Sequence, residues 1–528
     1  MQLRTVRRIW QAAFLVLFCY LVFKTAAGAA RIGTLGISAS FFLEIDPLIA
    51  LGMISATGEL YHVGLWGMLW ALVILLSALL FGRAFCSWVC PFGTIHHAVG
   101  WITRPGDKEA RIKRNAYRPS FALKYLLLVA FLLGALAGSL QVGLLDPLAL
   151  LHRSLAACLL PVFELGFRAL APAGSHLIYQ GSVPLFAFAY LTGAIVLVLL
   201  AANIVMPRFF CRVLCPLGAL LGIFSRFALF KIVRDENRCT GCGACTLSCE
   251  GGCNPQETLR RAECLMCFNC VAECPEGAFS LRFVPPERRE VPYPDVEGRR
   301  LFLAACFGFL FTPLARLTGA AGRIFSAAAI RPPGARKEED FLSRCVKCGQ
   351  CMRVCPTNVL QPALLETGIE GMWTPVLKMR YGVCDIHCTL CTQVCPTGAL
   401  QRLTPAQRNG LEPYPGRAER MVVKLGTAFV DRGRCLPWAM DRPCVACEEV
   451  CPVSPKAISG REAVVTTAGG AKLTLRQPHV DPVLCVGCGA CEHVCPVQDL
   501  PAIRVSAVGE SRSRGAGEAD RGFISQLK

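Results

Sequence analysis

Six groups of four cysteines account for 24 of the 32 cysteines in this chain of 528 residues, and their spacing is typical of metal ligation. Two groups between residues 239 and 275 have C-x2-C-x2-C-x3-C spacing. They are Cys239, Cys242, Cys245 and Cys249, followed by Cys264, Cys267, Cys270 and Cys274. Three thiolates on one tight turn reach three irons of a [4Fe-4S] cubane, and the fourth cysteine ligates the other cluster. We therefore expect Cys274 to complete the first cluster and Cys249 to complete the second.

Two other uses of these cysteines fit the spacing less well. Zinc sites usually combine two separated C-x2-C pairs, and disulfide frameworks are typical of short secreted chains. The second group closes on Pro275, whereas the first is followed by the sequence EGGCNP, which leaves Cys253 spare. Cys253 is therefore an alternative to Cys249 as a ligand.

Residues 336–508 contain four more groups, and a proline directly follows each of them. The groups are Cys345, Cys348, Cys351 and Cys355; Cys384, Cys388, Cys391 and Cys395; Cys435, Cys444, Cys447 and Cys451; and Cys485, Cys488, Cys491 and Cys495. Two of them have a longer first gap, which extends a loop without changing which thiolates can reach the irons. The sequence thus predicts four [4Fe-4S] clusters here and six in all.

A different motif, C-x3-C-P, occurs twice in the first half of the chain and contains Cys86, Cys90, Cys211 and Cys215. If the motifs are helical, cysteines four residues apart share one helix face. The duplication could bring all four thiols together as a redox or metal site that links the bilayer to the module at 239–283. The alternative is that small residues cap two helices before Pro91 and Pro216.

Ionisable residues near membrane segments are candidate functional groups. Asp46, Asp146, His152 and Arg153 are expected on the outer side, and His96 and His97 just inside Cys90. A quinol that loses two protons and two electrons needs a proton acceptor, and Asp46, Asp146 or His152 could serve. The two aspartates each precede a proline, which is also a common helix-start signal.

The elements that would position these residues are membrane helices, because 53% of the chain is hydrophobic and its mean hydropathy is +0.45. Four apolar stretches are long enough to span a bilayer: Ile9–Gly28, Val63–Phe81, Phe121–Leu140 and Pro184–Met206. Arginines and lysines flank only one side of them, so the positive-inside rule predicts a cytoplasmic N-terminus and a cytoplasmic module at 239–283. Residues 1–238 read as two repeats, each consisting of a span, an Asp-Pro-Leu segment, a second span and C-x3-C-P.

The formal net charge of +18 does not indicate nucleic-acid binding. Clusters with their thiolates are anionic and offset many of the basic residues, and anionic lipid headgroups account for the remaining excess. Cys19, Cys158 and Cys306 are isolated in apolar surroundings and are expected to be packing residues.

Residues 1–285 resemble the NapH/MauN-type membrane ferredoxins, on the four spans, the paired C-x3-C-P-[FL]-G and the trailing two-cluster ferredoxin. The resemblance implies a quinol-dehydrogenase subunit of a periplasmic reductase system in the bacterial inner membrane. It extends to relatives of the NosR and CcoG types. Those relatives suggest an alternative function, an accessory factor that reduces a metal or cofactor during maturation of a respiratory enzyme.

Residues 299–508 resemble the NapG/MauM-type ferredoxins, which carry a twin-arginine leader that Arg299 and Arg300 match. A linker segment at 284–335 precedes the four-cluster domain at 336–508. Its apolar run 301–314 predicts a fifth span with an exported C-terminal domain, and a cytoplasmic domain is the alternative. The resemblance implies that outer cysteine groups pair with each other and inner ones likewise, with adjacent pairing left open. The tail at 509–528 is expected to be disordered.

Together these features predict a four-span α-helical membrane bundle followed by α+β ferredoxin-like domains. The expected function is electron transfer from the membrane quinone pool, through six [4Fe-4S] clusters, to a cytochrome or reductase partner. Without a nucleotide-binding fingerprint or an acid–base dyad, the chemistry belongs to the clusters and the quinol.

Overall fold

The computed structural model describes residues 3–26, 40–59, 65–170, 185–257, 259–285, 329–466 and 470–512. The twin-arginine pair Arg299–Arg300, the predicted fifth span and the tail beyond residue 512 lie outside these residues. The sidedness that they imply is therefore still a prediction.

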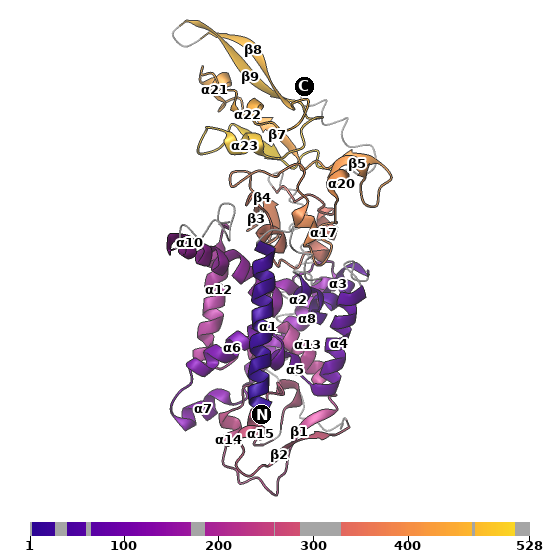
Figure 1. Ribbon diagram of the computed structural model, residues 1–528, viewed down its shortest axis with the longest axis vertical. Helices are drawn as coiled ribbons and strands as arrows, with labels where there is room; N and C mark the ends of the chain where they lie inside the picture. Colours follow the sequence, from indigo (N-terminus) through magenta and orange to yellow (C-terminus); the bar gives the residue numbers. More distant parts are fainter. Residues whose placement is uncertain are drawn as a thin grey trace.

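The molecule is elongated, with a helical bundle in the middle and a cysteine-rich module at each end (Figure 1). We call residues 230–285 the first module and residues 329–512 the second module. The N-terminus lies at the end of the bundle that carries the first module. The two modules therefore lie at opposite ends of the bundle.

Four helices run along the bundle: α1 (Leu3–Ala26), α4 (Leu65–Phe81), α8 (Leu123–Leu136) and α12 (Ala189–Ala201). Shorter helices complete it: α2 (Phe41–Glu44), α3 (Pro47–Thr57), α5 (Ala84–Trp88), α6 (Pro91–Ile102), α7 (Lys108–Asn115), α9 (Pro147–Ser154), α10 (Leu160–Leu170) and α13 (Pro216–Ser225). Single turns of 3-10 or π geometry join them: η2 (Pro119–Ala122), η3 (Val142–Leu144), η4 (Leu155–Leu159), η5 (Ala202–Ile204) and η6 (Phe210–Leu214).

Four of the short helices begin in the same way, with a capping residue followed by proline. Asp46 caps α3 and Asp146 caps α9, whereas Cys90 caps α6 and Cys215 caps α13. Proline suits the first helical position because its φ is already helical and no N–H is needed there. Helix α3 packs against α13, and α6 packs against α9. In both pairs, a short helix of the first repeat contacts a short helix of the second.

The membrane segments differ from the four predicted spans. Three described stretches are long and apolar enough to cross a membrane: Leu3–Thr25, Lys108–Leu136 and Pro147–Phe167. The predicted spans at 63–81 and 184–206 form the shorter apolar helices α4 and α12. The stretch Pro147–Phe167, expected only as an outer segment, continues from α9 through η4 into α10. This stretch contains the ionisable residues His152, Arg153 and Glu164 and is the least hydrophobic of the three, so it is hard to recognise from hydropathy alone.

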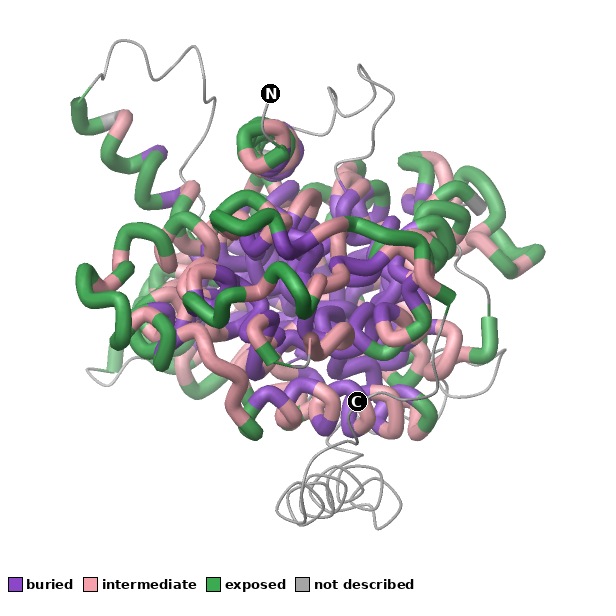
Figure 2. Tube along the Cα trace, turned by 90° about the horizontal axis from the view of Figure 1, so that it is seen from below, coloured by how far each residue is buried: buried purple, intermediate pink, exposed green. Residues whose placement is uncertain are grey.

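Large apolar side chains cover the outside of the bundle. Trp66 is 76% exposed, and Leu197 and Val198 are each 68% exposed. Buried positions gather in the centre and exposed ones at the rim (Figure 2). Apolar surface of this extent is unfavourable in water, so these faces are the lipid-contacting surface of a membrane protein.

The first module contains one antiparallel strand pair, β1 (Phe230–Arg234) with β2 (Phe279–Phe283), and the short helices α14 (Ala244–Leu247), η7 (Arg261–Glu263) and α15 (Asn269–Glu273). The second module has four more antiparallel pairs: β3 (Leu360–Pro362) with β4 (Pro375–Leu377), β5 (Asn409–Pro413) with β6 (Arg420–Val422), β7 (Thr427–Val430) with β10 (Ile503–Ser506), and β8 (Ile458–Thr466) with β9 (Lys472–Val480). Its helices are α17 (Glu338–Arg344), α18 (Gln350–Arg353), α19 (Leu390–Gln393), α20 (Pro405–Arg408), α21 (Leu436–Ala439), α22 (Ala446–Glu449) and α23 (Ala490–Val494). Sheet is therefore a small part of the molecule.

The second module extends beyond the predicted range 336–508 on both sides. Arg331 donates to Thr374 and lies 4.7 Å from the centre of the Phe341 ring. At the other end Ser511 is buried, and its hydroxyl accepts from the Lys424 backbone N–H at 2.6 Å. Residues 509–512 therefore belong to the folded module rather than to a disordered tail.

Candidate functional site

The four cysteine groups with 2-2-3 spacing share a loop that can hold an anion. The residues on both sides of the second cysteine have positive φ in each: Gly241 and Gly243, Met266 and Phe268, Lys347 and Gly349, and Gly487 and Gly489. Alternation of this kind turns successive backbone N–H groups toward one concave side, which favours a negatively charged occupant. The described cysteines form no disulfide. The loops and their free thiols thus fit [4Fe-4S] clusters.

In the first module, Cys249 lies near the second triplet, and its role as the fourth ligand of that cluster is still a prediction. The Cys249 thiol is within electrostatic range of the thiols of Cys264, Cys267 and Cys270. The spare Cys253 lies 3.5 Å from Cys249, sulfur to sulfur. Its hydrogen bond lowers the pKa of the Cys249 thiol to about 6, while the pKa of Cys253 is raised well above its ordinary value. Cys253 also lies within hydrogen-bonding reach of Cys264, so it remains the alternative to Cys249 as a ligand.

The second module pairs adjacent groups, and the outer-with-outer pairing implied by the resemblance is wrong. Cys395 lies with Cys345, Cys348 and Cys351. Cys355 lines a cavity of about 350 Å³ together with Cys384, Cys388 and Cys391.

The last two cysteine groups of the second module are related in the same way: the fourth cysteine of each lies with the other group. Cys495 lines a cavity of about 380 Å³ with Cys435, Cys444 and Cys447. Cys451 lies beside Cys488. Each pair of groups folds on itself locally, so a fourth cysteine reaches the nearest triplet rather than one a hundred residues away.

The C-x3-C-P thiols come together, but not on one helix face. Cys86 lies in α5 and Cys211 in the π-helical turn η6, whereas Cys90 and Cys215 cap the helices that follow. The chain turns between the two cysteines of each motif because the capping residue has extended backbone. All four thiols are buried, with exposed fractions of 4–7%.

The capping thiols accept hydrogen bonds at the starts of their helices. The Gly93 N–H donates to Cys90 Sγ at 3.4 Å, and the Gly218 N–H donates to Cys215 Sγ at 3.2 Å. Side chains are excluded at these glycines: a Cβ on Gly93 would lie 2.5 Å from the Cys86 carbonyl oxygen. The glycine of C-x3-C-P-[FL]-G is therefore required by close packing of the motif on itself.

Two buried arginines tie the motifs together, and the sequence analysis missed them. Arg83 donates to the Cys211 carbonyl at 3.3 Å, and Arg208 donates to the Cys86 carbonyl at 3.1 Å. Each arginine stands three residues before the first cysteine of its own motif and reaches the other motif. That repeated position in both copies was the available sequence signal.

The same arginines anchor the first module. Arg83 pairs with Glu263 at 3.1 Å and Arg208 with Glu250 at 2.9 Å. Lys124 also pairs with Glu263, in the buried interior. Two carboxylates next to cluster ligands therefore hold the module against the C-x3-C-P segments.

The predicted outer residues are fully buried. Asp46 and Asp146 accept backbone hydrogen bonds as helix caps, which confirms the helix-start interpretation. Their carboxyl groups also lie within hydrogen-bonding reach of each other. His152 Nδ1 lies 2.9 Å from the Cys348 carbonyl oxygen, and Arg153 donates to the Lys347 carbonyl at 3.2 Å. His152 and Arg153 therefore join the bundle to the second module.

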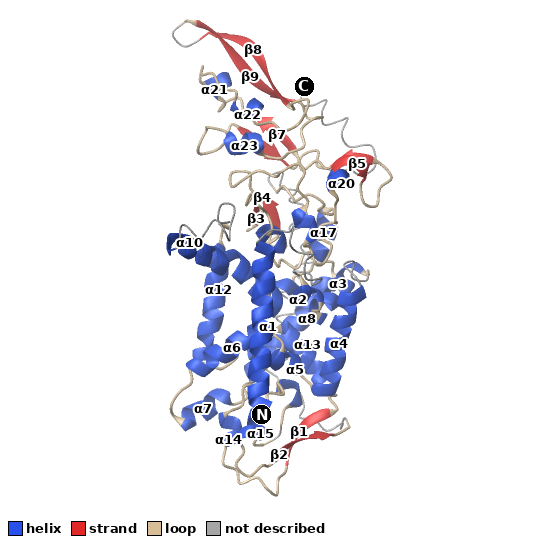
Figure 3. Ribbon diagram, in the orientation of Figure 1, coloured by secondary structure: helices blue, strands red, loops and turns tan. Residues whose placement is uncertain are grey.

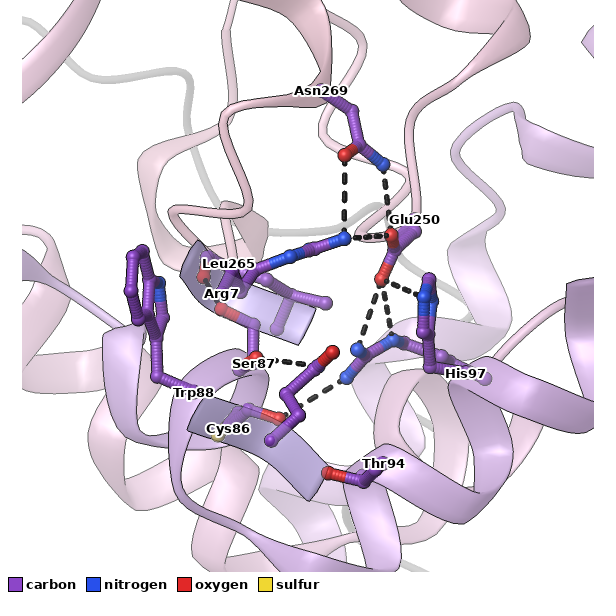
Figure 4. Close-up of polar contacts among 12 residues, drawn as sticks. Arg7, Cys86, Ser87, Trp88, Thr94, His97, Glu250, Leu265 and Asn269 are labelled. Atoms are coloured by element: carbon purple, nitrogen blue, oxygen red, sulfur yellow. Dashed lines mark hydrogen bonds and ion pairs between the residues drawn. The ribbon is translucent and has the colours of Figure 1, made fainter. Parts of the chain in front are cut away.

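The predicted inner histidines have separate environments. His96 is buried and bonds to Asn203. His97 Nδ1 lies 3.1 Å from Glu250 Oε2, in a group that also contains Arg7 and Asn269 (Figure 4).

A cavity of about 640 Å³ lies beside this group, between α1, α6, α7 and the first module. Arg4, Arg7, Arg8, His96, His97, Trp101, Arg104, Arg111, Arg114, Arg208, Cys249 and Glu250 are among the residues that line it. It is strongly basic and lies next to a predicted cluster ligand.

Three family models match the chain. A 4Fe-4S binding domain matches residues 63–107 and 186–234, and a second 4Fe-4S binding domain matches residues 236–252. A 4Fe-4S dicluster domain matches residues 344–399 and 441–498. The matches thus fall on the C-x3-C-P half and on both modules.

Curated relatives match the two halves separately. The ferredoxin-type protein NapH of Escherichia coli is 29% identical over 45% of this chain and 74% of its own length. The ferredoxin-type protein NapG of E. coli is 36% identical over 34% of this chain and 71% of its own length. The putative electron transport protein YccM of E. coli is 29% identical over 46% of this chain, which spans 63% of YccM. No solved structure matches the chain.

Proposed function

This chain belongs to the ferredoxin-type electron-transport proteins represented by NapH and NapG, and we propose that it oxidises quinol in the membrane for a respiratory partner. The 24 cysteines of the six groups would hold six [4Fe-4S] clusters, two in the first module and four in the second. Such clusters accept and release single electrons when bound. The chain's own residues hold them, bind the quinol and remove its protons.

The observation that carries this proposal is the basic cavity against Cys249 and Glu250. It lies at the bundle end that carries the first module, where a quinol head at the membrane surface could enter. The buried Asp46, Asp146 and His152 remain the predicted alternative, but their exposed fractions of 0–2% leave little access for a quinol. We therefore favour the cavity as the quinol site.

His97 is the proton acceptor in this proposal, and Glu250 orients it. Burial alone would raise the pKa of the Glu250 carboxyl, but the guanidinium groups of Arg208 and Arg7 hold that pKa well below its usual range. Glu250 therefore stays ionised and fixes the imidazole at 3.1 Å. The neighbouring arginines stabilise the negative charge that forms on the quinol oxygen as its proton leaves.

The test is quinol-dependent bleaching of the cluster absorbance in purified, anaerobic protein. We expect menaquinol or ubiquinol to bleach the wild type, and His97→Gln to slow the bleaching at least about 100-fold, as for loss of a general base. Reduction by dithionite should be unchanged in the variant.

Asp46→Asn is the matched variant for the predicted alternative, because asparagine also caps helices well. Loss of quinol reactivity in Asp46→Asn but not in His97→Gln would place the quinol at the aspartates. If no quinol reduces the protein and Cys86, Cys90, Cys211 and Cys215 bind copper, the accessory function replaces quinol oxidation.

A further inference from the structure

We propose that Cys86, Cys90, Cys211 and Cys215 hold an additional thiolate-bound iron–sulfur cluster inside the bundle, and that it passes electrons between the two modules. This inference deepens the proposed function, in which the modules at opposite ends of the bundle must exchange electrons. Val346 and Cys348 of the second module and Leu265 of the first module contact one buried core, in which the four thiols also lie.

The four thiols are mutual neighbours. Cys90 is within electrostatic range of Cys86 and Cys211, and Cys215 is within range of Cys86, Cys90 and Cys211. Cys211 in turn acts on Cys86. All six pairs are therefore close, although the thiols come from two segments more than 120 residues apart in the sequence.

The surroundings of these thiols suit an anionic centre. Arg83 is within electrostatic range of Cys86 and Cys215, and Lys124 is within electrostatic range of Cys215. Arg208 acts on Cys211. These three cations are buried, and the carboxylates that pair with them among the described residues, Glu250 and Glu263, belong to the first module. Buried charge needs compensation, and four thiolates around an iron–sulfur core supply it.

The thiols are also preorganised as thiolate ligands. Cys90 and Cys215 lie at the N-termini of α6 and α13, helices of 12 and 10 residues, where backbone N–H groups and the helix dipole favour negative charge. Four cysteine thiolates are the usual ligand set of an iron–sulfur cluster.

The site contacts the first module directly. Ser87 Oγ donates to the Leu265 carbonyl at 2.6 Å, and Trp88 Nε1 donates to the Met266 carbonyl at 3.1 Å. Leu265 and Met266 lie between the ligand candidates Cys264 and Cys267. One short step therefore separates a first-module cluster from the four thiols.

A second short step leads to the other end of the bundle. Cys90 is within range of Asp146, the cap of α9. His152, six residues further along α9 and about 9 Å away at 1.5 Å per residue, bonds to the Cys348 carbonyl. Val346 and Cys348 are themselves part of the buried core of the bundle. The additional centre would thus divide the crossing into two shorter electron transfers, with no other reactant required.

The first experiment counts iron and acid-labile sulfide in the anaerobically purified full chain. Six cubanes account for about 24 irons, at four each, and we expect the wild type to exceed this by two to four. The variant with all four cysteines changed to serine should lose that excess and one component of the EPR-monitored redox titration. The matched control, Cys19→Ser with Cys158→Ser, should keep both.

Serine caps helices well, so the double variant Cys90→Ser/Cys215→Ser preserves α6 and α13 and serves if the fourfold variant does not accumulate. Wild-type iron of about 24 that the substitutions leave unchanged would overturn the proposal. Stoichiometric zinc or copper in place of the excess iron would overturn it as well.

The second experiment tests the bridge, using proteoliposomes with dithionite trapped inside and ferricyanide outside. We expect the wild type and the control to reduce ferricyanide, and the fourfold variant to do so at least tenfold more slowly. Undiminished transfer by the variant would disprove the bridging role. Because no quinol is present, failure of quinol oxidation and failure of the bridge are separate results.

Discussion

At the scale of single residues, the first module is attached to the bundle through buried ion pairs. Glu263 accepts from Arg83 and from the Tyr125 hydroxyl, each at 3.1 Å, and also pairs with Lys124. The side chains of Arg83 and Lys124 are 1% and 0% exposed. Removal of one partner from such a group leaves uncompensated charge in a low-dielectric interior, which is costly. Glu263 therefore has a larger role in docking than an ion pair at the surface.

Substitution of Glu263 by glutamine should lower the free energy of unfolding by about 3–5 kcal/mol, because it strands two buried cations. The matched change is Glu273→Gln, which removes a partly exposed pair with Arg4 at 2.6 Å. Exposed pairs contribute at most about 1 kcal/mol. Thermal unfolding in detergent measures the loss of stability in both variants. Equal losses of stability would contradict a special role for Glu263 in docking.

At the scale of elements, the C-x3-C-P motif is a junction between two helices. The first cysteine lies in a short helix or π-helical turn, and the second caps the next helix. A π-helical turn is rare and frequently marks a functional site, and η6 carries Cys211. The motif therefore folds so that four thiols lie near the starts of two helices, α6 and α13.

The substitution Gly93→Ala tests this junction. Its Cβ would lie 2.5 Å from the Cys86 carbonyl oxygen, so we expect a loss of about 1–3 kcal/mol from overpacking. Gly166→Ala in α10 is the control, because no heavy atom lies within 4 Å of a Cβ there. Alanine in an exposed helix is favourable by up to about 1 kcal/mol. The melting temperatures of the two variants test this expectation. A melting temperature of Gly93→Ala equal to that of the wild type would rule out a tightly packed junction.

At the scale of the whole molecule, the bundle carries its two modules at opposite ends (Figure 1). The second module is closely docked: a Cβ on Gly143 would lie 1.9 Å from the Val346 carbonyl oxygen. Arg344 pairs with Glu59 at 2.8 Å, and Arg353 pairs with Glu164. With basic residues concentrated at the other end, the positive-inside rule favours a second module on the outer side.

A fusion of alkaline phosphatase to the C-terminus tests this sidedness, because the enzyme is active only outside the cytoplasm. We expect activity in the full-length fusion, and none in a matched fusion placed after residue 285. Activity only in the fusion after residue 285 would show the opposite orientation. Activity in neither fusion would contradict an outer second module.

The sequence by itself determined the cysteine groups, the internal repeat and the capping role of Asp46 and Asp146. These depend on local spacing, because a C-x2-C-x2-C turn or an Asp-Pro helix start needs only neighbouring residues. Only the tertiary structure decided that Cys395 lies with the triplet that begins at Cys345, and that Arg83 and Arg208 cross between the motifs. It also placed two modules at opposite ends of one bundle. Such contacts arise from packing between distant segments, and local spacing cannot specify which distant partner the chain brings near.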